Sequence, residues 1–438
     1  MGSRSLPRPA TTGADRWFGI KTQIHSKLMN ALSPEQLKTL NKDGMREQIG
    51  GVVERLIADE QLPMTLAERE RVIEEVLDEV FGLGPLEPLL KDPTVSDILV
   101  NGFDNVYVER AGRLVETNVR FKDQAHVRMT IDRIVSNIGR RIDDSSPIVD
   151  ARLADGSRMC AVIPPLSLIG PVMSIRRFGK KLLSTADLLK NETLTPGMLD
   201  FLRGCVEARL NIVVSGGSGA GKTTLLNTLS RFIPEEERVV TIEDTAELQM
   251  QQPHVVRLET RPVNIEGAGA ITQRDLVINA LRMRPDRIIV GECRGSEAFD
   301  MMQAMNTGHD GSMTTTHANS TRDAFSRLET LVMMASQNVP DRVIRQMLAS
   351  AIQIVIHCSR LNDGTRKLTS ISEVTGTEGE HVEMQDIFVL ERTGIGERGK
   401  VLGRFAATGA KPQVLDRMKA YGVRLSPAIF SEAQELKA

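Results

Sequence analysis

Eight consecutive residues constrain the fold of this chain more than any other feature. They match the pattern G-x-x-x-x-G-K-[ST] at every fixed position, and they are Gly216, Gly217, Ser218, Gly219, Ala220, Gly221, Lys222 and Thr223. An apolar run typical of a buried strand, residues 210–215, precedes them, and a helix-forming run, residues 224–229, follows them. The order strand, glycine turn and helix predicts an α/β sheet with this turn at the carboxyl end of a strand.

The turn has the chemistry of a phosphate site. Glycines let backbone N–H groups point inward around phosphate oxygens, and the N-terminus of the following helix adds its positive end. We expect Lys222 to reach the β- and γ-phosphates of a nucleotide and the Thr223 hydroxyl to ligate Mg²⁺, with Thr224 completing the binding turn. The alternative is a chance glycine turn before a helix, which does not account for the preceding strand.

Two further apolar runs end in carboxylates. One leads to Glu292, and the other leads to the pair Glu243 and Asp244. A nucleotide-bound Mg²⁺ needs carboxylate or water ligands, and hydrolysis needs a group that activates the attacking water. Ligands of an open α/β sheet gather beyond the carboxyl ends of its strands, so both positions suit these tasks. Two alternatives stay open: the acids cap following helices or face solvent, or Asp244 or Glu247 shares the role of Glu243.

Histidines and arginines supply the remaining candidates. Residues 307–319 are rich in small and hydroxyl residues around His309 and His317. His317 is placed for a polar contact with a γ-phosphate. The alternative is that His317 has a purely structural role. No cysteine or carboxylate set at ligand spacing accompanies them, which disfavours zinc. Arginines ahead of the phosphate loop can reach phosphate oxygens from a neighbouring domain or subunit, or form a solvated basic face. They are Arg140, Arg141, Arg152, Arg158, Arg176 and Arg177.

The chain divides into regions that differ in their predicted secondary structure. We predict a flexible lead at 1–30, a helical extension at 31–82, a smaller α+β domain at 83–180, a linker at 181–195 and the domain of the phosphate loop at 196–438. Capping boxes at Ser33 and Thr65 open the two helices of the extension. In the last domain helices alternate with apolar runs, which predicts a mainly parallel sheet. The runs are residues 211–215, 238–242, 255–258, 287–290, 312–316 and 352–357.

Composition disfavours several classes of protein. The 55 basic and 57 acidic residues nearly balance, and only 3% of residues are aromatic, so a nucleic-acid partner is not expected. No stretch approaches the ~18 apolar residues that span a bilayer, and the first thirty residues lack the apolar core of a signal peptide. The 4 cysteines stand apart, which suits a reducing compartment. We therefore expect a cytoplasmic protein, and any work at a membrane would be done from its surface, through partners.

Four blocks of this sequence resemble the secretion-superfamily ATPases of type II secretion, type IV secretion and type IV pili. They are the Walker A loop at 216–223, an Asp-box-like segment at 241–248, a Walker B-like segment at 284–292 and a His-box-like segment at 308–319. Within the superfamily the chain resembles the CpaF-type ATPases of the tight-adherence (Tad) pilus. Residues 82–90, 96–102 and 174–178 extend the likeness upstream, so that it covers about residues 65–400.

The resemblance implies a fold, an activity and partners. The fold would be a RecA-like ATPase domain preceded by a smaller α+β domain that is PAS-like. The activity would be Mg²⁺-dependent ATP hydrolysis in a homohexameric ring. The ring would lie at the inner membrane, on platform proteins of a pilus or secretion system.

The resemblance also implies roles for residues. Lys222 and Thr223 would bind phosphate and Mg²⁺, and Glu243 would support the metal or its water. Glu292 would activate the attacking water, and His317 would contact the γ-phosphate. Two arginines match those that the N-terminal domain of the family supplies to the phosphates. They are Arg158 and Arg176, with Arg177 as the alternative to Arg176.

Three other functions stay open. A sibling ATPase would drive type IV secretion or conjugation-type transfer. A RecA-like nucleic-acid motor is a second alternative, against which the balanced charge and few aromatics count. A third is a nucleotide-gated scaffold that assembles without turnover, against which Glu292 at a strand end counts.

Overall fold

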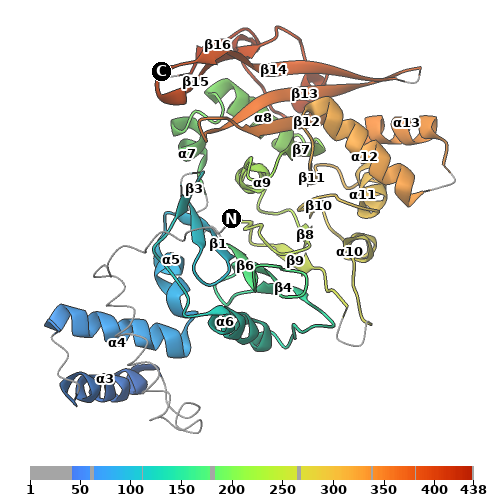
Figure 1. Cartoon of the computed structure of the whole chain (residues 1–438). Coiled ribbons are helices and arrows are strands. Elements are labelled where there is room, and N and C mark those ends of the chain that lie inside the picture. Colours follow the sequence, from blue (N-terminus) through green and yellow to red (C-terminus); the bar gives the residue numbers. More distant parts are fainter. Residues whose placement is uncertain are drawn as a thin grey trace, which may run out of the picture. The chain divides into compact units, whose positions relative to one another are not determined.

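The computed structural model describes residues 42–59, 64–110, 112–177, 183–263, 268–336, 339–379 and 381–436. The chain forms two compact units, Met1–Phe178 and Gly179–Ala438, and Figure 1 colours them along the sequence. The predicted flexible lead and the helix start at Ser33 lie outside the described residues. No helix of the described part is both long and apolar enough to cross a bilayer.

The first unit begins with two helices, α3 (Lys42–Asp59) and α4 (Leu66–Phe81), which share a small apolar cluster. The capping box predicted at Thr65 is present. The Thr65 side chain accepts a hydrogen bond from the backbone N–H of Glu68, and the Glu68 carboxylate accepts one from the backbone N–H of Thr65.

A six-stranded antiparallel sheet forms the rest of the first unit, in the order β3-β2-β1-β6-β5-β4. Its strands are β1 (Val95–Asn101), β2 (Val106–Arg110), β3 (Arg113–Glu116), β4 (Ile148–Arg152), β5 (Arg158–Val162) and β6 (Val172–Arg176). The short helices η1 (Gly84–Leu86) and α5 (Glu87–Lys91) precede it. Helix α6 (Gln124–Asn137), capped by Asp123, packs its apolar stripe on this sheet. The α+β class predicted for this region is confirmed.

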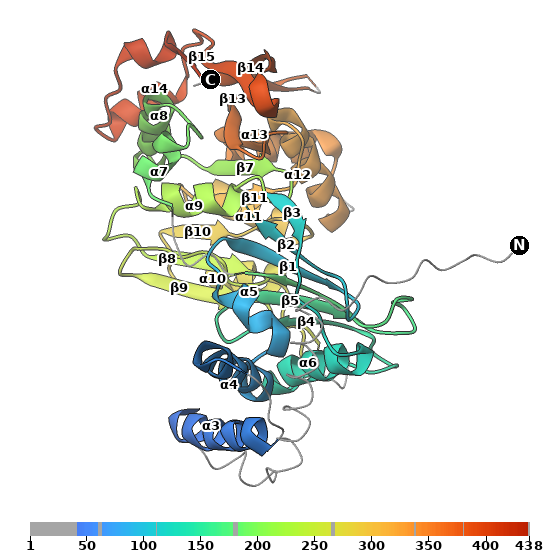
Figure 2. The same cartoon turned by 60° about the vertical axis from the view of Figure 1, so that its left-hand side comes forward.

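The second unit is built on a ten-stranded sheet, in the order β16-β15-β14-β13-β12-β7-β11-β10-β8-β9. Six of its strands are parallel, and Figure 2 shows five of them, β7, β11, β10, β8 and β9, one below another. They are β7 (Ile212–Gly216), β8 (Val239–Glu243), β9 (Val255–Glu259), β10 (Arg287–Val290), β11 (Met313–Thr316) and β12 (Ile354–Arg360). All six predicted apolar runs form these strands, with small shifts at their ends.

Four strands extend this sheet beyond β12 with antiparallel pairing. They are β13 (Arg366–Glu378), β14 (His381–Ile395), β15 (Val401–Ala407) and β16 (Ala433–Glu435). The prediction of a mainly parallel sheet missed them. Much of β14 is exposed, and β13 has polar residues even at buried positions, such as Lys367, Ser372 and Glu373. Neither strand therefore shows the continuous apolar run that marks a strand buried on both faces.

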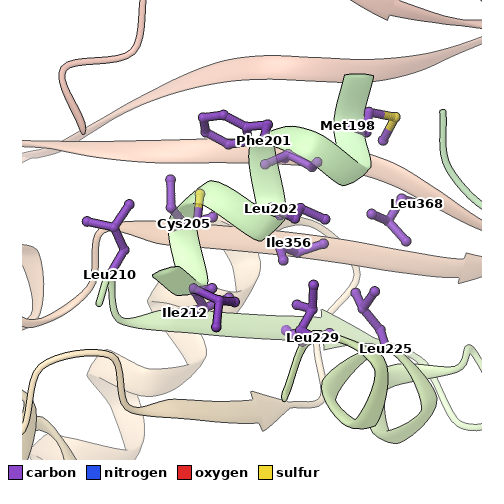
Figure 3. Close-up of a cluster of buried hydrophobic side chains, with 14 of the residues drawn as sticks. Met198, Phe201, Leu202, Cys205, Leu210, Ile212, Leu225, Leu229, Ile356 and Leu368 are labelled. Carbon is purple, nitrogen blue, oxygen red and sulfur yellow. The ribbon is translucent and has the colours of Figure 1, made fainter. Parts of the chain in front are cut away.

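The two faces of the parallel part of the sheet pack into two separate apolar cores. Ile212 and Val214 of β7 lie in the core with α8 (Pro196–Glu207) and α9 (Lys222–Ser230), whereas Val213 lies in the other core. Figure 3 shows side chains of α8 and α9 gathered against β7 and β12 in the first core. Because both faces are buried, successive residues of β7, β8 and β10 are mostly apolar. The strands therefore hold the phosphate loop on a rigid base.

Helices complete both faces. The second core contains residues of α10 (Gln273–Ala280), α11 (Glu297–Asn306), α12 (Thr321–Ala335) and α13 (Asp341–Ala351). The remaining elements of the second unit are α7 (Thr185–Lys190), η2 (Glu397–Gly399), α14 (Val414–Ala420) and η3 (Pro427–Phe430). Residues of α14 and η3 join the core beside α8.

Candidate functional site

The glycine turn runs from β7 into α9. Gly216 and Gly221 have φ angles of 151° and 100°, which residues with a side chain rarely adopt. A Cβ at Gly216 would lie 2.3 Å from the carbonyl oxygen of Cys358 on the adjacent β12. At Gly217 a Cβ would meet no atom of the described residues within 4 Å. The turn is therefore packed tightly against the sheet and open on its outer side, as a cradle for phosphate requires.

Lys222 is the first residue of α9 and is buried, with 8% of its surface exposed. Its Nζ donates to the carbonyl oxygens of Gly216 and Gly217 at 2.9 and 3.1 Å. Gly221 caps the helix without a side chain, so the first N–H groups of α9 receive no side-chain cap. A phosphate in the turn would satisfy these N–H groups and offer Lys222 stronger, charge-assisted hydrogen bonds.

Three of the predicted residues meet at the carboxyl ends of the parallel strands. His317 follows β11, and its Nδ1 lies 2.9 Å from Oε1 of Glu292 and 3.4 Å from Nζ of Lys222. Because the ionised carboxylate only accepts hydrogen bonds, Nδ1 is the protonated ring nitrogen and donates a hydrogen bond to Glu292. Lys222 thus acts on this pair through its charge. The second histidine of the segment, His309, precedes β11 at the other end of the strand.

Arg294 is a member of this group that sequence reasoning missed. Its Nη2 donates to Oε2 of Glu292 at 2.7 Å. Burial raises the pKa of Glu292, but the hydrogen bonds from Arg294 and His317 outweigh burial and set the pKa below its usual value. Glu292 is therefore ionised at neutral pH. The only signal in the sequence was a basic residue two positions after the carboxylate.

Glu243 ends β8 and is 4% exposed. Its Oε2 accepts hydrogen bonds from the backbone N–H groups of Glu247 and Leu248 at 2.7 and 2.9 Å. Its Oε1 is buried and has no hydrogen-bond partner among the described residues. Burial raises the pKa of this carboxyl to about 7, against the lowering effect of the two N–H groups. One oxygen thus shapes the following loop, and the other is available to a further donor or cation.

This donor set fits Mg²⁺ held together with a nucleotide. Within the described part of the chain, no group of three or more His, Cys, Asp or Glu could hold a metal. Mg²⁺ usually takes only one or two protein ligands beside phosphate oxygens and waters. The Thr223 hydroxyl, in the first turn of α9, and the unpartnered Oε1 of Glu243 suit that need.

The predicted arginines lie in the first unit, whereas the phosphate loop lies in the second. Arg152, Arg158 and Arg176 are direct neighbours across β4, β5 and β6, so they share one face of the sheet. Arg176 also donates to Asp97 on β1 at 3.0 Å. Arg177 instead binds backbone carbonyls at and just before β1, which favours a structural role.

Known families and proteins match most of this chain. The profile of the family described as "Type II/IV secretion system protein" matches residues 79–398, and that of "Type II secretion system protein E, N-terminal domain" matches residues 17–81. A putative conjugal transfer protein of Mycobacterium tuberculosis is 38% identical over 307 residues, which are 69% of this chain and 87% of that protein. The type IV secretion system protein VirB11 of Brucella suis is 32% identical over 322 residues, which cover 67% of this chain and 89% of VirB11. A crystal structure of the Brucella suis VirB11 ATPase with sulphate is 31% identical, covers 67% of this chain and 97% of that one, and has a TM-score of 0.37.

Proposed function

Because this chain belongs to the family of type II/IV secretion system proteins, we propose that it hydrolyses ATP, with Mg²⁺, at the phosphate loop of residues 216–223. The observation that carries the proposal is the meeting of Lys222, His317 and Glu292 beside the turn, with Nδ1 of His317 3.4 Å from Nζ of Lys222 and 2.9 Å from Oε1 of Glu292. A cation, a ring N–H and a carboxylate together serve a reaction that moves negative charge onto phosphate oxygens.

Each group has a task in this proposal. The turn and Lys222 bind the phosphates, and Glu292 orients the attacking water. The water oxygen bonds to the γ-phosphorus while the bond from that phosphorus to the bridging oxygen breaks, and a proton of the water passes to an oxygen of the released phosphate, which yields ADP and phosphate. Since the pKa of Glu292 is lowered, this carboxylate polarises and positions the water more than it abstracts a proton. His317 contacts the γ-phosphate.

Thr223 and Glu243 would hold Mg²⁺ beside the phosphates, Glu243 directly or through a water. Bound there, Mg²⁺ supplies positive charge that balances the phosphate oxygens. The buried oxygen of Glu243 that lacks a hydrogen-bond partner among the described residues supports this assignment.

A ring would turn this chemistry into motion. We propose a homohexamer in which Arg158 and Arg176 supply guanidinium groups to the phosphates, so that ATP and ADP favour different conformations of the subunit. Arg158 and Arg176 are direct neighbours across β5 and β6, which puts two guanidinium groups on one face of the sheet and supports this assignment. In this proposal each subunit has the regions predicted from the sequence. They are the helical extension at 31–82, the α+β domain at 83–180, the linker at 181–195 and the ATPase domain at 196–438.

The work of the ring would be assembly, and in some settings retraction, of a Tad or type IV-like pilus, or type II-like secretion. It would act at the cytoplasmic side of the inner membrane through platform proteins. The likeness to CpaF-type ATPases supports the pilus. A transfer ATPase of type IV secretion is the second candidate, and the conjugal transfer protein and VirB11 among the relatives favour it.

Steady-state hydrolysis by the purified full chain tests the enzymatic proposal. Lys222→Ala should abolish turnover, and Glu292→Gln should bind ATP but not release phosphate. Arg404→Ala, which removes only the exposed ion pair with Glu391 on β14, is the matched control and should keep wild-type turnover. Normal hydrolysis by either site variant would refute the site assignment.

Deletion of the gene, followed by complementation with Lys222→Ala, separates the two cellular roles. The pilus proposal expects surface pili to disappear and to return only with the wild-type chain. Loss of DNA or protein transfer with normal pili would instead establish the second candidate.

A further inference from the structure

Two arginines outside the sequence motifs lie against the phosphate loop. Arg360 ends β12, Arg366 begins β13, and the two residues are directly paired across this hairpin. Nε of Arg366 donates to the carbonyl oxygen of Gly219 at 2.7 Å. A Cβ built at Gly221 would lie 3.5 Å from Cδ of Arg366, and one built at Gly219 would lie 3.7 Å from Nη1 of Arg360. Both side chains therefore reach the glycine turn.

The strand order explains which side of the turn they occupy. β12 is the neighbour of β7 on one side, and β11, β10 and β8 follow β7 on the other. These strands are parallel, so their carboxyl ends meet at one edge of the sheet. Glu292 and Glu243 consequently stand on one flank of the turn, and Arg360 and Arg366 on the opposite flank. The first flank suits a metal ion and the attacking water, and the second suits phosphate oxygens that the metal does not neutralise.

The geometry of the hairpin suits an anion. Arg360 and Arg366 are cross-strand neighbours, so two guanidinium groups stand side by side at the phosphate loop, and a guanidinium fork matches phosphate oxygens. Asp363, the acid of the connecting turn, accepts hydrogen bonds from the backbone N–H groups of Thr365 and Val401 at 2.9 and 3.0 Å. That carboxylate shapes the hairpin, and its hydrogen bonds to these N–H groups hold the pKa of Asp363 below its usual value although burial opposes them.

We propose that Arg360 and Arg366 bind the α- and β-phosphates of the nucleotide from within the same chain and so set nucleotide affinity. This inference rests on the proposed ATPase function and adds two binding residues to its site. A guanidinium has five N–H donors in a fixed fork, so Arg366 can hold Gly219 through Nε and a phosphate oxygen through its Nη groups. Because the reacting γ-phosphate lies toward Glu292 and His317, these arginines act on binding and leave the hydrolysis step to the opposite flank.

Binding measurements on the full chain test this inference. The variants are Arg360→Ala, Arg366→Ala and Arg366→Lys, with Arg404→Ala as the control for loss of an exposed arginine. Displacement of a fluorescent ADP analogue gives the affinities for ADP and for inorganic pyrophosphate. Each alanine variant should bind ADP about tenfold more weakly, the loss expected for a charge-assisted hydrogen bond. Pyrophosphate should weaken by the same factor, KM for ATP should rise with it, and kcat should stay near the wild-type value.

The lysine variant and the melting temperature separate binding from folding. Arg366→Lys keeps a charge but lacks the fork, so its ADP affinity should fall between those of the wild type and Arg366→Ala. Without nucleotide, the Arg360→Ala and Arg366→Lys variants should melt with the wild type. If Arg366→Ala has a lower melting temperature than the wild type, the nucleotide affinities of Arg360→Ala and Arg366→Lys decide the test.

Each other outcome overturns a defined statement. Wild-type ADP affinity in the arginine variants, with binding lost in Lys222→Ala, refutes this inference and leaves the ATPase proposal standing. Weaker ADP binding with unchanged pyrophosphate binding places the arginines at the ribose or base and refutes the phosphate assignment. A wild-type chain that binds no nucleotide refutes the ATPase proposal itself.

Discussion

The strand that leads to Glu292 begins with a buried ion pair, and breaking this pair should destabilise the second unit. Arg287, the first residue of β10, is 0% exposed. Its Nε and Nη2 donate to the two oxygens of Glu237 at 2.5 and 3.0 Å, and its Nη1 donates to the carbonyl oxygen of Val206 at 2.9 Å. Arg209 adds a further contact to Glu237 at 3.3 Å. The guanidinium is therefore fully enclosed, and Glu237 balances its charge.

The substitution Glu237→Gln keeps the shape of the side chain and removes the charge that balances Arg287. Removing one partner of a buried ion pair costs about 3–5 kcal/mol, because the other charge stays buried and uncompensated. Glu237 is 12% exposed at its side chain, so some water reaches it and we expect the lower end, about 3 kcal/mol. With about 2–4 °C per kcal/mol for a unit of this size, the melting temperature should fall by about 6–12 °C.

Thermal denaturation followed by circular dichroism measures this loss, and hydrogen exchange of the β10 amides assigns it to the second unit. Glu391→Gln is the matched control, because it removes a carboxylate from an ion pair whose two side chains are each 47% exposed. That change should cost less than about 1 kcal/mol. The double variant Arg287→Met with Glu237→Gln should recover part of the loss, because no buried charge remains.

Two results would refute this reasoning. One is a Glu237→Gln chain that melts within about 2 °C of the wild type. In a unit of this size, so small a shift corresponds to a loss of less than about 1 kcal/mol. The other is a double variant that is less stable than both single variants, because it would show that packing, not charge, decides the cost.

Three further predictions concern the surroundings of the phosphate loop. Burial lowers the pKa of His357 in the folded chain, so the unfolded chain binds a proton at this histidine more readily than the folded chain does. The free energy of unfolding therefore falls as the pH drops below the ordinary histidine pKa. When the pH is lowered from about 7.5 to about 5.5, the melting temperature of His357→Gln should fall by less than that of the wild type. Arg294→Ala removes a hydrogen bond that lowers the pKa of Glu292, so the acidic limb of the kcat profile should move to higher pH, and Arg294→Lys should restore part of the shift. Gly216→Ala should lower the melting temperature strongly, because its Cβ would lie 2.3 Å from a carbonyl oxygen, whereas Gly217→Ala, with nothing within 4 Å, should melt as the wild type does.

Features with local determinants could be predicted from the sequence. The glycines of the phosphate loop, Lys222 and the flanking strand and helix lie within one short segment, and their backbone conformation follows from residue type. The capping box at Thr65 joins atoms only three residues apart. The six parallel strands were predictable for a related reason. β7, β8, β10 and β12 are buried at most positions and mostly apolar, and this pattern is visible without knowledge of the neighbouring strands.

The tertiary structure alone decided which distant residues meet. Arg366 and Gly219 are 147 positions apart, and Arg287, which lies within the Walker B-like segment, is a buried partner of Glu237 rather than a surface residue. β13, β14 and β16 were not predicted because polar residues, exposed in most of β14 and β16 and partly buried in β13, interrupt the apolar pattern. These contacts depend on the order of strands in the sheet, which differs from their order in the chain. Strand order arises when whole faces pack together, so no short stretch of sequence specifies it.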